Sequence, residues 1–252
     1  MHLFRRVVME IVTVTVVMGA IAPWAAAGPL DPPPGPVAAT FKTLAEVEPR
    51  LAITEANTPG DGASLYRIEQ PGSYYLIGPV TGVAGKGGIV IAADDVTIDL
   101  NGFTMSGVAG SGSGVHVVGP MQRPRILNGT IANWGGDGVR SDQAIGARIE
   151  GVTSSQNETG FHVGRDAVVI ECSALSNTIY GFWSEDFATF VGCVSSDSFA
   201  GFLCSGGANL SRCAARSNGV GFQISGNAAS TGCIAVGEGW GFHILDGGIV
   251  SD

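Results

Sequence analysis

Short runs of alternating hydrophobic and polar residues recur along this chain about every 20 residues, separated by Gly, Ser, Asn and Asp. The pair Gly-Phe marks these runs at residues 160–161, 181–182, 201–202, 221–222 and 241–242. Between the pairs stand Cys172, Cys193, Cys213 and Cys233, at intervals of 21, 20 and 20 residues. A unit of about 20 residues is too short for the helix pairs of helical repeats, but it accommodates short strands joined by turns. The pattern therefore predicts an all-β repeat in which equivalent strands stack on one another.

Alternation along each strand predicts which side chains point into the core. After each Gly-Phe corner we expect one inward face, formed by Phe161 and Val163, Phe182 and Ser184, Phe202 and Cys204, Phe222 and Ile224, and Phe242 and Ile244. On the Cys-containing strand we expect an inward face of Ile170, Cys172 and Ala174, and in the next unit Val191, Cys193 and Ser195. The Gly before each Phe suits a corner with positive φ, and Asn177, Asp197 and Asn218 suit the turns.

The region before these units follows the same pattern less regularly. It contains Gln-Pro-Gly-Ser-Tyr-Tyr-Leu at residues 70–76, Gly-Ile-Val-Ile at 88–91, Val-Thr-Ile-Asp-Leu-Asn-Gly at 96–102 and Gly-Val at 114–115. These motifs, together with the repeat, resemble secreted bacterial right-handed parallel β-helix repeat proteins of the pectate-lyase-like superfamily. The resemblance covers residues 40–252 and implies a right-handed parallel β-helix (solenoid) of about seven to eight rungs. Because that superfamily includes lyases, hydrolases, epimerases and adhesins, the resemblance implies a fold and leaves the activity open.

The first 27 residues carry the features of an export signal. Arg5 and Arg6 precede an apolar stretch over residues 11–24, and Ala25-Ala26-Ala27 matches a cleavage site. A signal peptide over residues 1–27 predicts a secreted or cell-envelope protein, periplasmic or extracellular, with no membrane association after cleavage. A retained membrane anchor is the alternative.

The remaining chain divides into a linker, a cap and the repeats. Residues 28–39 form a Pro-rich linker, residues 40–87 an N-terminal cap with lead-in strands, and residues 88–252 the parallel β-helix repeats. Thr43-Leu44-Ala45-Glu46 predicts a short helical cap, with Leu51 on its apolar face. Residues 241–252 begin one more unit without a cap. Either that coil lies open and allows end-to-end self-association, or the chain is truncated.

The charge balance limits the partners. The formal net charge is −9, from 22 acidic and 13 basic residues. An acidic surface disfavours nucleic acid and anionic lipid, and it disfavours polyuronates unless cations bridge the charges. Polysaccharide and surface protein remain as partners.

The cysteines are the first candidates for chemistry. Four Cys at rung spacing form a line about 14 Å long, because neighbouring strands lie about 4.8 Å apart, so they cannot converge on one zinc ion. A ladder of small buried thiols is the preferred interpretation, and disulfides among Cys172, Cys193, Cys213 and Cys233 are the alternative. Cys204 has no Cys in register, which predicts a buried free thiol. The sequence predicts no metal site and no cofactor.

A row of outward side chains follows the corners, at His116, Arg140, His162, Trp183, Leu203, Gln223 and His243. His116, Arg140, His162 and Trp183 are the predicted ligand-binding residues, with Trp183 as a stacking platform for a glycan and with Asp137 and Asp142 supplying polar contacts. A mixed solvent-facing surface is the alternative interpretation.

Two sets of charged residues are candidates for catalysis. Glu150 and Glu171 are expected outward and one rung apart, a spacing that suits a retaining glycosidase but that any two acids in register would share. Asp137, Arg140 and Asp142 form the other candidate set. The Asn-Thr-Asp, Gly-His-Gly and Arg-Ile-Lys motifs of polygalacturonase-like members are absent, as are nucleophile elbows and phosphate loops.

Three functions follow from these observations. The first is an exported, non-catalytic surface or envelope protein that binds glycan or protein along its outward strand face. The second is a polysaccharide lyase or glycoside hydrolase that uses Asp137, Arg140, Asp142, Glu150 or Glu171. The third is a self-associating structural scaffold. The sequence leaves open the ligand, the oligomeric state and whether the protein is catalytic, and the missing motifs favour a protein without catalytic activity.

Overall fold

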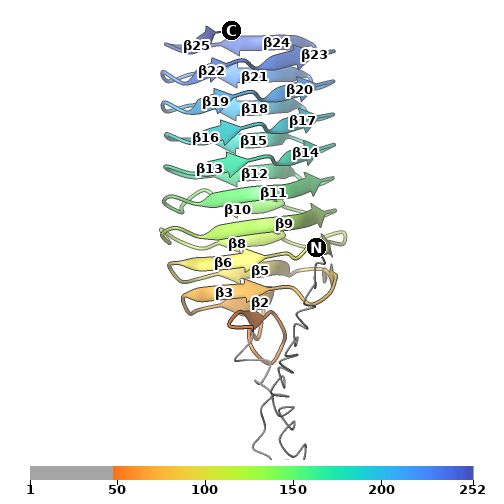
Figure 1. Cartoon of the computed structure of the whole chain (residues 1–252). Helices are drawn as coiled ribbons and strands as arrows, with labels where there is room; N and C mark the ends of the chain where they lie inside the picture. Colours follow the sequence, from red (N-terminus) through yellow and green to blue (C-terminus); the bar gives the residue numbers. More distant parts are fainter. Residues whose placement is uncertain (1–47, 252) are drawn as a thin grey trace, which may run out of the picture. The chain divides into compact units, whose positions relative to one another are not determined.

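The computed structural model describes residues 48–251, which form a parallel β-solenoid (Figure 1). Within this range there is no helix, and ten strands succeed one another along the longest sheet path. The predicted parallel β-helix is confirmed, but the prediction of seven to eight rungs was too low. The first coils are built by strands that lack the Gly-Phe and Cys markers, so the sequence pattern did not count them.

The described strands form two sheets, and within each sheet the paired strands run parallel. The main path of the 16-stranded sheet A contains β1 (Leu51–Ala52), β3 (Gly72–Tyr75), β6 (Val96–Asp99), β9 (Arg125–Ala132), β11 (Arg148–Ser155), β13 (Val168–Ile170), β16 (Thr189–Val191), β19 (Asn209–Ser211), β22 (Ala229–Thr231) and β25 (Ile249–Ser251). A side branch contains β4 (Val80–Thr81), β7 (Thr104–Ser106), β14 (Ser173–Leu175), β17 (Val194–Ser196), β20 (Ala214–Arg216) and β23 (Ile234–Val236). The nine-stranded sheet B contains β2 (Ser64–Ile68), β5 (Gly87–Ile91), β8 (Val115–Val117), β10 (Val139–Ser141), β12 (Thr159–Val163), β15 (Tyr180–Ser184), β18 (Ala200–Cys204), β21 (Val220–Ile224) and β24 (Trp240–Ile244).

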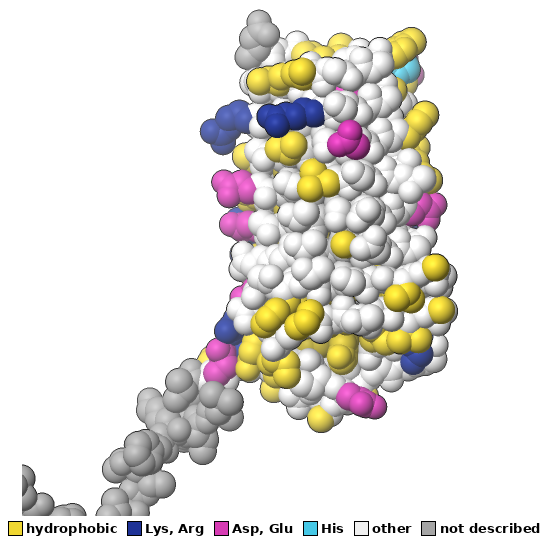
Figure 2. Space-filling view, turned by 90° about the vertical axis from the view of Figure 1, so that its right-hand side faces the viewer, with side chains coloured by type: hydrophobic (Ala, Val, Ile, Leu, Met, Phe, Trp, Pro, Cys, Tyr) yellow, Lys and Arg dark blue, Asp and Glu magenta, His cyan; other side chains and the backbone are white. Residues whose placement is uncertain are grey.

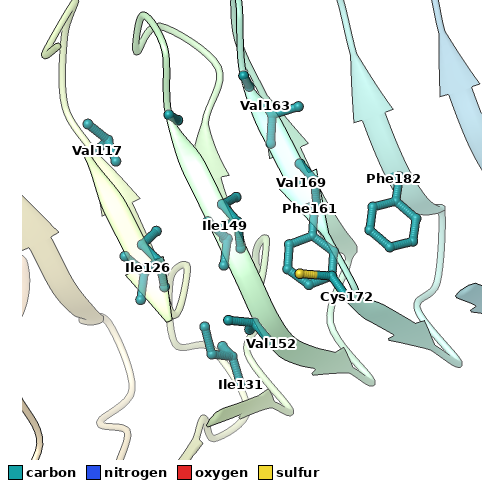
Figure 3. Close-up of a cluster of buried hydrophobic side chains, with 14 of the residues drawn as sticks. Val117, Ile126, Ile131, Ile149, Val152, Phe161, Val163, Val169, Cys172 and Phe182 are labelled. Atoms are coloured by element: carbon teal, nitrogen blue, oxygen red, sulfur yellow. The ribbon is translucent and has the colours of Figure 1, made fainter. Parts of the chain in front are cut away.

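The core is a column of stacked side chains inside the coils. Successive rings of Phe161, Phe182, Phe202, Phe222 and Phe242 lie parallel, with centroids 4.7 to 4.9 Å apart. Figure 3 shows Phe161 beside Val169 of the facing strand β13 and Cys172 of the corner after that strand, with Phe182 one coil further along. The predicted inward face of sheet B is therefore confirmed, except at Ile244, which is exposed in the last described coil because β24 pairs with β21 alone.

The corner within sheet A corrects one sequence prediction. Val169 and Phe190 point into the core, whereas Ile170 and Val191 are only partly buried. Strict alternation fails because Glu171 adopts a left-handed conformation, with φ of 50°, and bends the chain between β13 and β14. Cys172 and Ala174 still point inward after this bend, as predicted.

The Gly before each core Phe has a different role from the one predicted, because none of these Gly residues has a positive φ. A Cβ atom on Gly181 would lie 2.1 Å from the Ser195 hydroxyl oxygen and 2.6 Å from the Gly201 carbonyl oxygen. The position therefore needs Gly because strands β15 and β18 and the facing sheet approach too closely for a side chain.

The turn between the side branch of sheet A and sheet B is held by buried side-chain amides. The Asn157 Oδ1 atom accepts a hydrogen bond from the Trp134 backbone N–H at 2.8 Å, and the Asn177 Oδ1 atom accepts one from Asn157 at 3.1 Å. The Asn218 Oδ1 atom accepts a hydrogen bond from the Ser198 backbone N–H at 3.0 Å. Asp197 takes the left-handed conformation, with φ of 56°. Asn177, Asp197 and Asn218 therefore lie in turns, as predicted, either through side-chain hydrogen bonds to the backbone or through a left-handed conformation.

Several predictions fall outside the described residues. The signal peptide, the linker and Thr43 to Glu46 of the capping helix lie within residues 1–47. Leu51, which was expected on the face of that helix, instead belongs to strand β1 and pairs with Tyr74. Strands β2 and β3 are already coils of the solenoid, because they pair in register with β5 and β6.

The side of the solenoid turned toward the viewer in Figure 2 carries scattered charged side chains among mostly uncharged surface. No extended patch of like charge is visible on this side. Within residues 48–251, no helix is both long and apolar enough to span a membrane.

We expect Phe202→Ala to lower the free energy of unfolding by about 3 to 5 kcal/mol, because the ring is fully buried between two stacked neighbours. Phe199→Ala is the matched control, since Phe199 is exposed and should change the free energy by less than about 0.5 kcal/mol. Urea unfolding of both variants measures the difference. Equal effects would contradict the core assigned to the Phe column.

Candidate functional site

The outward row predicted from the sequence exists on sheet B. Strand pairing aligns His116 with Arg140, Arg140 with His162, and His162 with Trp183. The row continues through Leu203, Gln223 and His243, as predicted. It also extends to Arg67 and Val90 on the earlier strands β2 and β5. The row expected from the sequence began at His116, so it left out both residues, and no Gly-Phe or Gly-Val pair at the regular spacing precedes Arg67.

The centre of the row is a stack of two rings. The imidazole of His162 and the indole of Trp183 lie 3.8 Å apart at an interplanar angle of 6°. The stack leaves the His162 residue only 6% exposed, although it lies on the outer face. Tyr180 lies beside the indole, with ring centroids 5.4 Å apart. The three rings make a partly exposed aromatic surface on strands β12 and β15.

Two carboxylates face the edges of the His162 ring. The Asp137 Oδ2 atom is 3.7 Å from Nδ1, and the Glu185 Oε1 atom is 3.9 Å from Nε2. Both distances exceed a hydrogen bond, and Nε2 is a buried atom with no hydrogen-bond partner. The Glu185 side chain is 60% exposed. The arrangement therefore combines a buried, unpaired ring nitrogen with an exposed carboxylate that can accept a hydrogen bond from a ligand.

Arg140 and Asp142 form an ion pair beside this ring. The Arg140 Nε atom donates to Asp142 at 3.1 Å. Burial favours a higher pKa for Asp142, but the hydrogen bond and charge of Arg140 outweigh it and lower the pKa. The same hydrogen bond raises the pKa of Arg140, whereas burial and the Arg140 charge lower the pKa of His116. Arg140 is thus held in its protonated form, which suits binding and opposes a role as a catalytic base.

Glu150 and Glu171 do not form the pair expected from the sequence. Glu150 pairs in register with Ile170, so it is one position away from Glu171. The Glu150 carboxylate instead binds Arg148 at 2.8 Å, and Glu171 occupies the left-handed corner. Both belong to the sheet A side of the coil. The structure therefore brings Asp137, Arg140 and Asp142 together with His162 and separates these residues from the two glutamates.

A hollow of about 310 Å³ adjoins the other end of the row. Arg67, Val90 and His116 line it, together with Ser113. The Arg67 guanidinium binds Glu69 at 2.8 Å and Asp61 at 3.6 Å, which offsets its charge. A larger hollow of about 680 Å³ lies beside residues 57–61 and does not include the aromatic residues of the row. In residues 48–251, no cluster of three or more His, Cys, Asp or Glu side chains could hold a metal ion.

The cysteines are free thiols that line the core. Cys172, Cys193, Cys204 and Cys213 are buried, and Cys233 is partly buried. Burial raises the pKa of Cys172 and of Cys204 to about 12, so both remain protonated at neutral pH. The predicted ladder of buried small side chains is confirmed, and so is the predicted free thiol of Cys204.

The comparisons with known proteins describe the fold. No protein-family model matches the chain, and no curated protein matches it. A solved structure described as the crystal structure of pectate lyase Pel9A is similar, with a TM-score of 0.41 and 14% identity, over 73% of this chain and 70% of that chain. The strand pairing by itself defines the protein as a parallel β-helix repeat protein.

We expect alkylation to separate the four buried thiols from the partly buried thiol of Cys233. Iodoacetamide at pH 8 should label Cys233 before the other four cysteines, because their sulfur atoms are buried, and it should do so slowly, because the hydrogen bond with Cys213 raises the pKa of Cys233. Peptide mass spectrometry gives the labelled positions, and the same reaction in denaturant should modify all five. Rapid labelling of Cys204 in the native protein would contradict the assigned core.

We expect the contribution of Asp142 to stability to depend on pH. Its pKa is lowered in the folded state, so the carboxylate stabilises the fold above the unfolded-state pKa of about 4 and loses this effect as the pH falls through the folded-state pKa. Asp142→Asn should therefore lower the melting temperature at pH 7, and the gap to wild type should narrow below pH 4. Asp186→Asn, at an exposed position, is the control. A gap that stays constant with pH would count against the ion pair.

Proposed function

We propose that this protein is an exported, non-catalytic β-helix protein of the cell envelope or the extracellular space that binds glycan on the outer face of sheet B. The observation that carries the proposal is the His162–Trp183 stack with carboxylates at its edges. The export features of residues 1–27 support the location.

The chemistry of the surface matches a carbohydrate. A sugar ring has apolar faces and a rim of hydroxyl groups, so it pairs with an aromatic face surrounded by hydrogen-bond acceptors. One face of Trp183 stacks on His162, and the rest of the partly exposed indole supplies the aromatic surface, whereas Asp137, Asp142 and Glu185 supply acceptors. Charge-assisted hydrogen bonds from hydroxyls to carboxylates are stronger than those between neutral groups.

The ligand class is restricted by charge. Carboxylates at Asp137, Asp142 and Glu185 surround the stack, and the chain has a net charge of −9. Arg140 is the cation in the centre of the row, and Asp142 offsets its charge. A neutral glycan therefore fits this surface better than a polyuronate.

The site geometry favours binding over catalysis. Arg140 has a raised pKa because of Asp142, so it is a weak base. The His162 nitrogens lie 3.7 and 3.9 Å from the two carboxylates, so the structure contains no hydrogen bond between His162 and either carboxylate. A polysaccharide lyase or hydrolase is the outcome that the following experiment would detect.

We expect Trp183→Ala to weaken glycan binding roughly 10- to 100-fold, because the variant loses a stacking surface. The purified mature chain would be screened on a glycan array, and the affinity for each positive glycan measured by calorimetry, with product release assayed on the same glycans. Ile234→Ala, an exposed position on β23 of sheet A, is the control and should bind like wild type. Product release would overturn the non-catalytic assignment, and equal binding by Trp183→Ala would overturn the site.

A further inference from the structure

The coil of β15 carries three partly or fully exposed aromatic residues, and Phe199, just before β18 on the next coil, is also exposed. Strand β15 and the turn after it carry Tyr180, Trp183 and Phe187. On the neighbouring coils the position of Trp183 is taken by His162 and Leu203, and that of Tyr180 by Thr159 and Ala200. The row along the solenoid axis is therefore mixed, whereas strand β15 and the turn after it form an aromatic band across it.

Phe187 has a conformation that its side chain does not favour. Its φ is 45°, in the left-handed region that bulky residues rarely adopt. Equivalent turns of other coils place Asp166, Gly207 and Asn227 there, with φ of 57°, 81° and 64°. A phenyl ring at this position is strained and also 53% exposed, so neither backbone preference nor core packing accounts for it.

The neighbouring coils hold the Phe187 ring in place. A Cβ atom on Gly207 would lie 3.0 Å from the ring, so the absence of a side chain there leaves room for it. The Arg165 guanidinium of the preceding coil lies 6.0 Å from the ring centroid. Trp183 has the corresponding partner in His162, at 3.8 Å. Each of these two rings of the β15 coil is thus accompanied by a nitrogen-bearing side chain of the β12 coil.

Glu185 lies between the two rings in the sequence and faces the unpaired Nε2 atom of His162 at 3.9 Å. A hydroxyl group of a bound ligand would donate to the exposed Glu185 carboxylate. The band therefore combines an aromatic surface at Trp183, a hydroxyl site at Glu185 and a second aromatic surface at Phe187.

We infer that the glycan crosses the solenoid along the coil of β15, with one sugar unit on Trp183 and another on Phe187, instead of running along the axial row. This inference rests on the proposed function. The ligand class is a neutral, unbranched oligosaccharide long enough to span both rings. Beyond Trp183 the axial row offers Leu203 and Gln223, which supply no further stacking surface.

Calorimetry with cellohexaose, xylohexaose and mannohexaose, and with the corresponding disaccharides, tests the inference. For whichever hexasaccharide binds wild type, Phe187→Ala should weaken binding 5- to 30-fold. Gln223→Ala on the axial row should bind within twofold of wild type. Trp240→Ala is the matched aromatic control, because Trp240 is 62% exposed and occupies the register of Tyr180 three coils away. It should also bind within twofold of wild type.

A second variant separates binding from folding. Gly at position 187 accepts a positive φ, so Phe187→Gly should unfold at the same temperature as wild type or a higher one while losing affinity as Phe187→Ala does. Lower affinity together with unchanged or increased stability supports a ligand contact.

The outcomes distinguish the two proposals. If Trp183→Ala loses binding and Phe187→Ala retains it, the glycan site stands and the transverse path is wrong. A loss of affinity in Gln223→Ala in place of Phe187→Ala would establish an axial path. If no hexasaccharide binds, the inferred ligand class and path are wrong while the array result still decides the proposed function. If Trp183→Ala binds like wild type, both proposals are overturned.

Discussion

The spacing between neighbouring parallel strands is the constraint on which this structure depends. Strands in a sheet lie about 4.8 Å apart, and the Phe rings of successive coils are separated by the same distance, 4.7 to 4.9 Å. A flat ring fits this spacing only when the ring above it is parallel, so each coil fixes the side chain of the next. A single coil has nothing to stack on, and stability therefore comes from neighbouring coils together.

The same constraint acts at the corners through the backbone. Because successive coils stack at the distance between neighbouring strands, equivalent turns must adopt similar backbone conformations. Left-handed residues such as Glu171 and Asp197, and amide side chains such as Asn157 and Asn177, perform this role. At Gly181 the constraint is steric, because neighbouring strands approach so closely that no Cβ atom fits.

The fold could be predicted from the sequence, because equivalent side chains stack on one another and so recur at regular intervals. The same repeat predicted the alignment of His116, Arg140, His162 and Trp183. It was insufficient wherever a left-handed residue shifts the alternation. For that reason Ile170 was expected inside, and Glu150 was expected opposite Glu171. The burial of His162 was also not predictable, since it depends on how the Trp183 ring turns. Phe187 was overlooked because a hydrophobic residue in a turn carries no signal until its backbone angle is known.

A repeat fold makes its exceptions informative. Residues at equivalent positions of successive coils must satisfy the same stacking geometry. A residue whose type differs from that of its equivalents is therefore not explained by the core or by the turn. Phe187 departs at a cost in backbone strain, and Trp183 is the one indole in a column of smaller side chains. Both departures occur on one coil, and Trp183 stacks on His162, whose Nε2 atom is unpaired. Independent exceptions that meet at one place are better explained by a shared ligand than by separate accidents of packing, because packing alone would favour Gly or Asn at position 187.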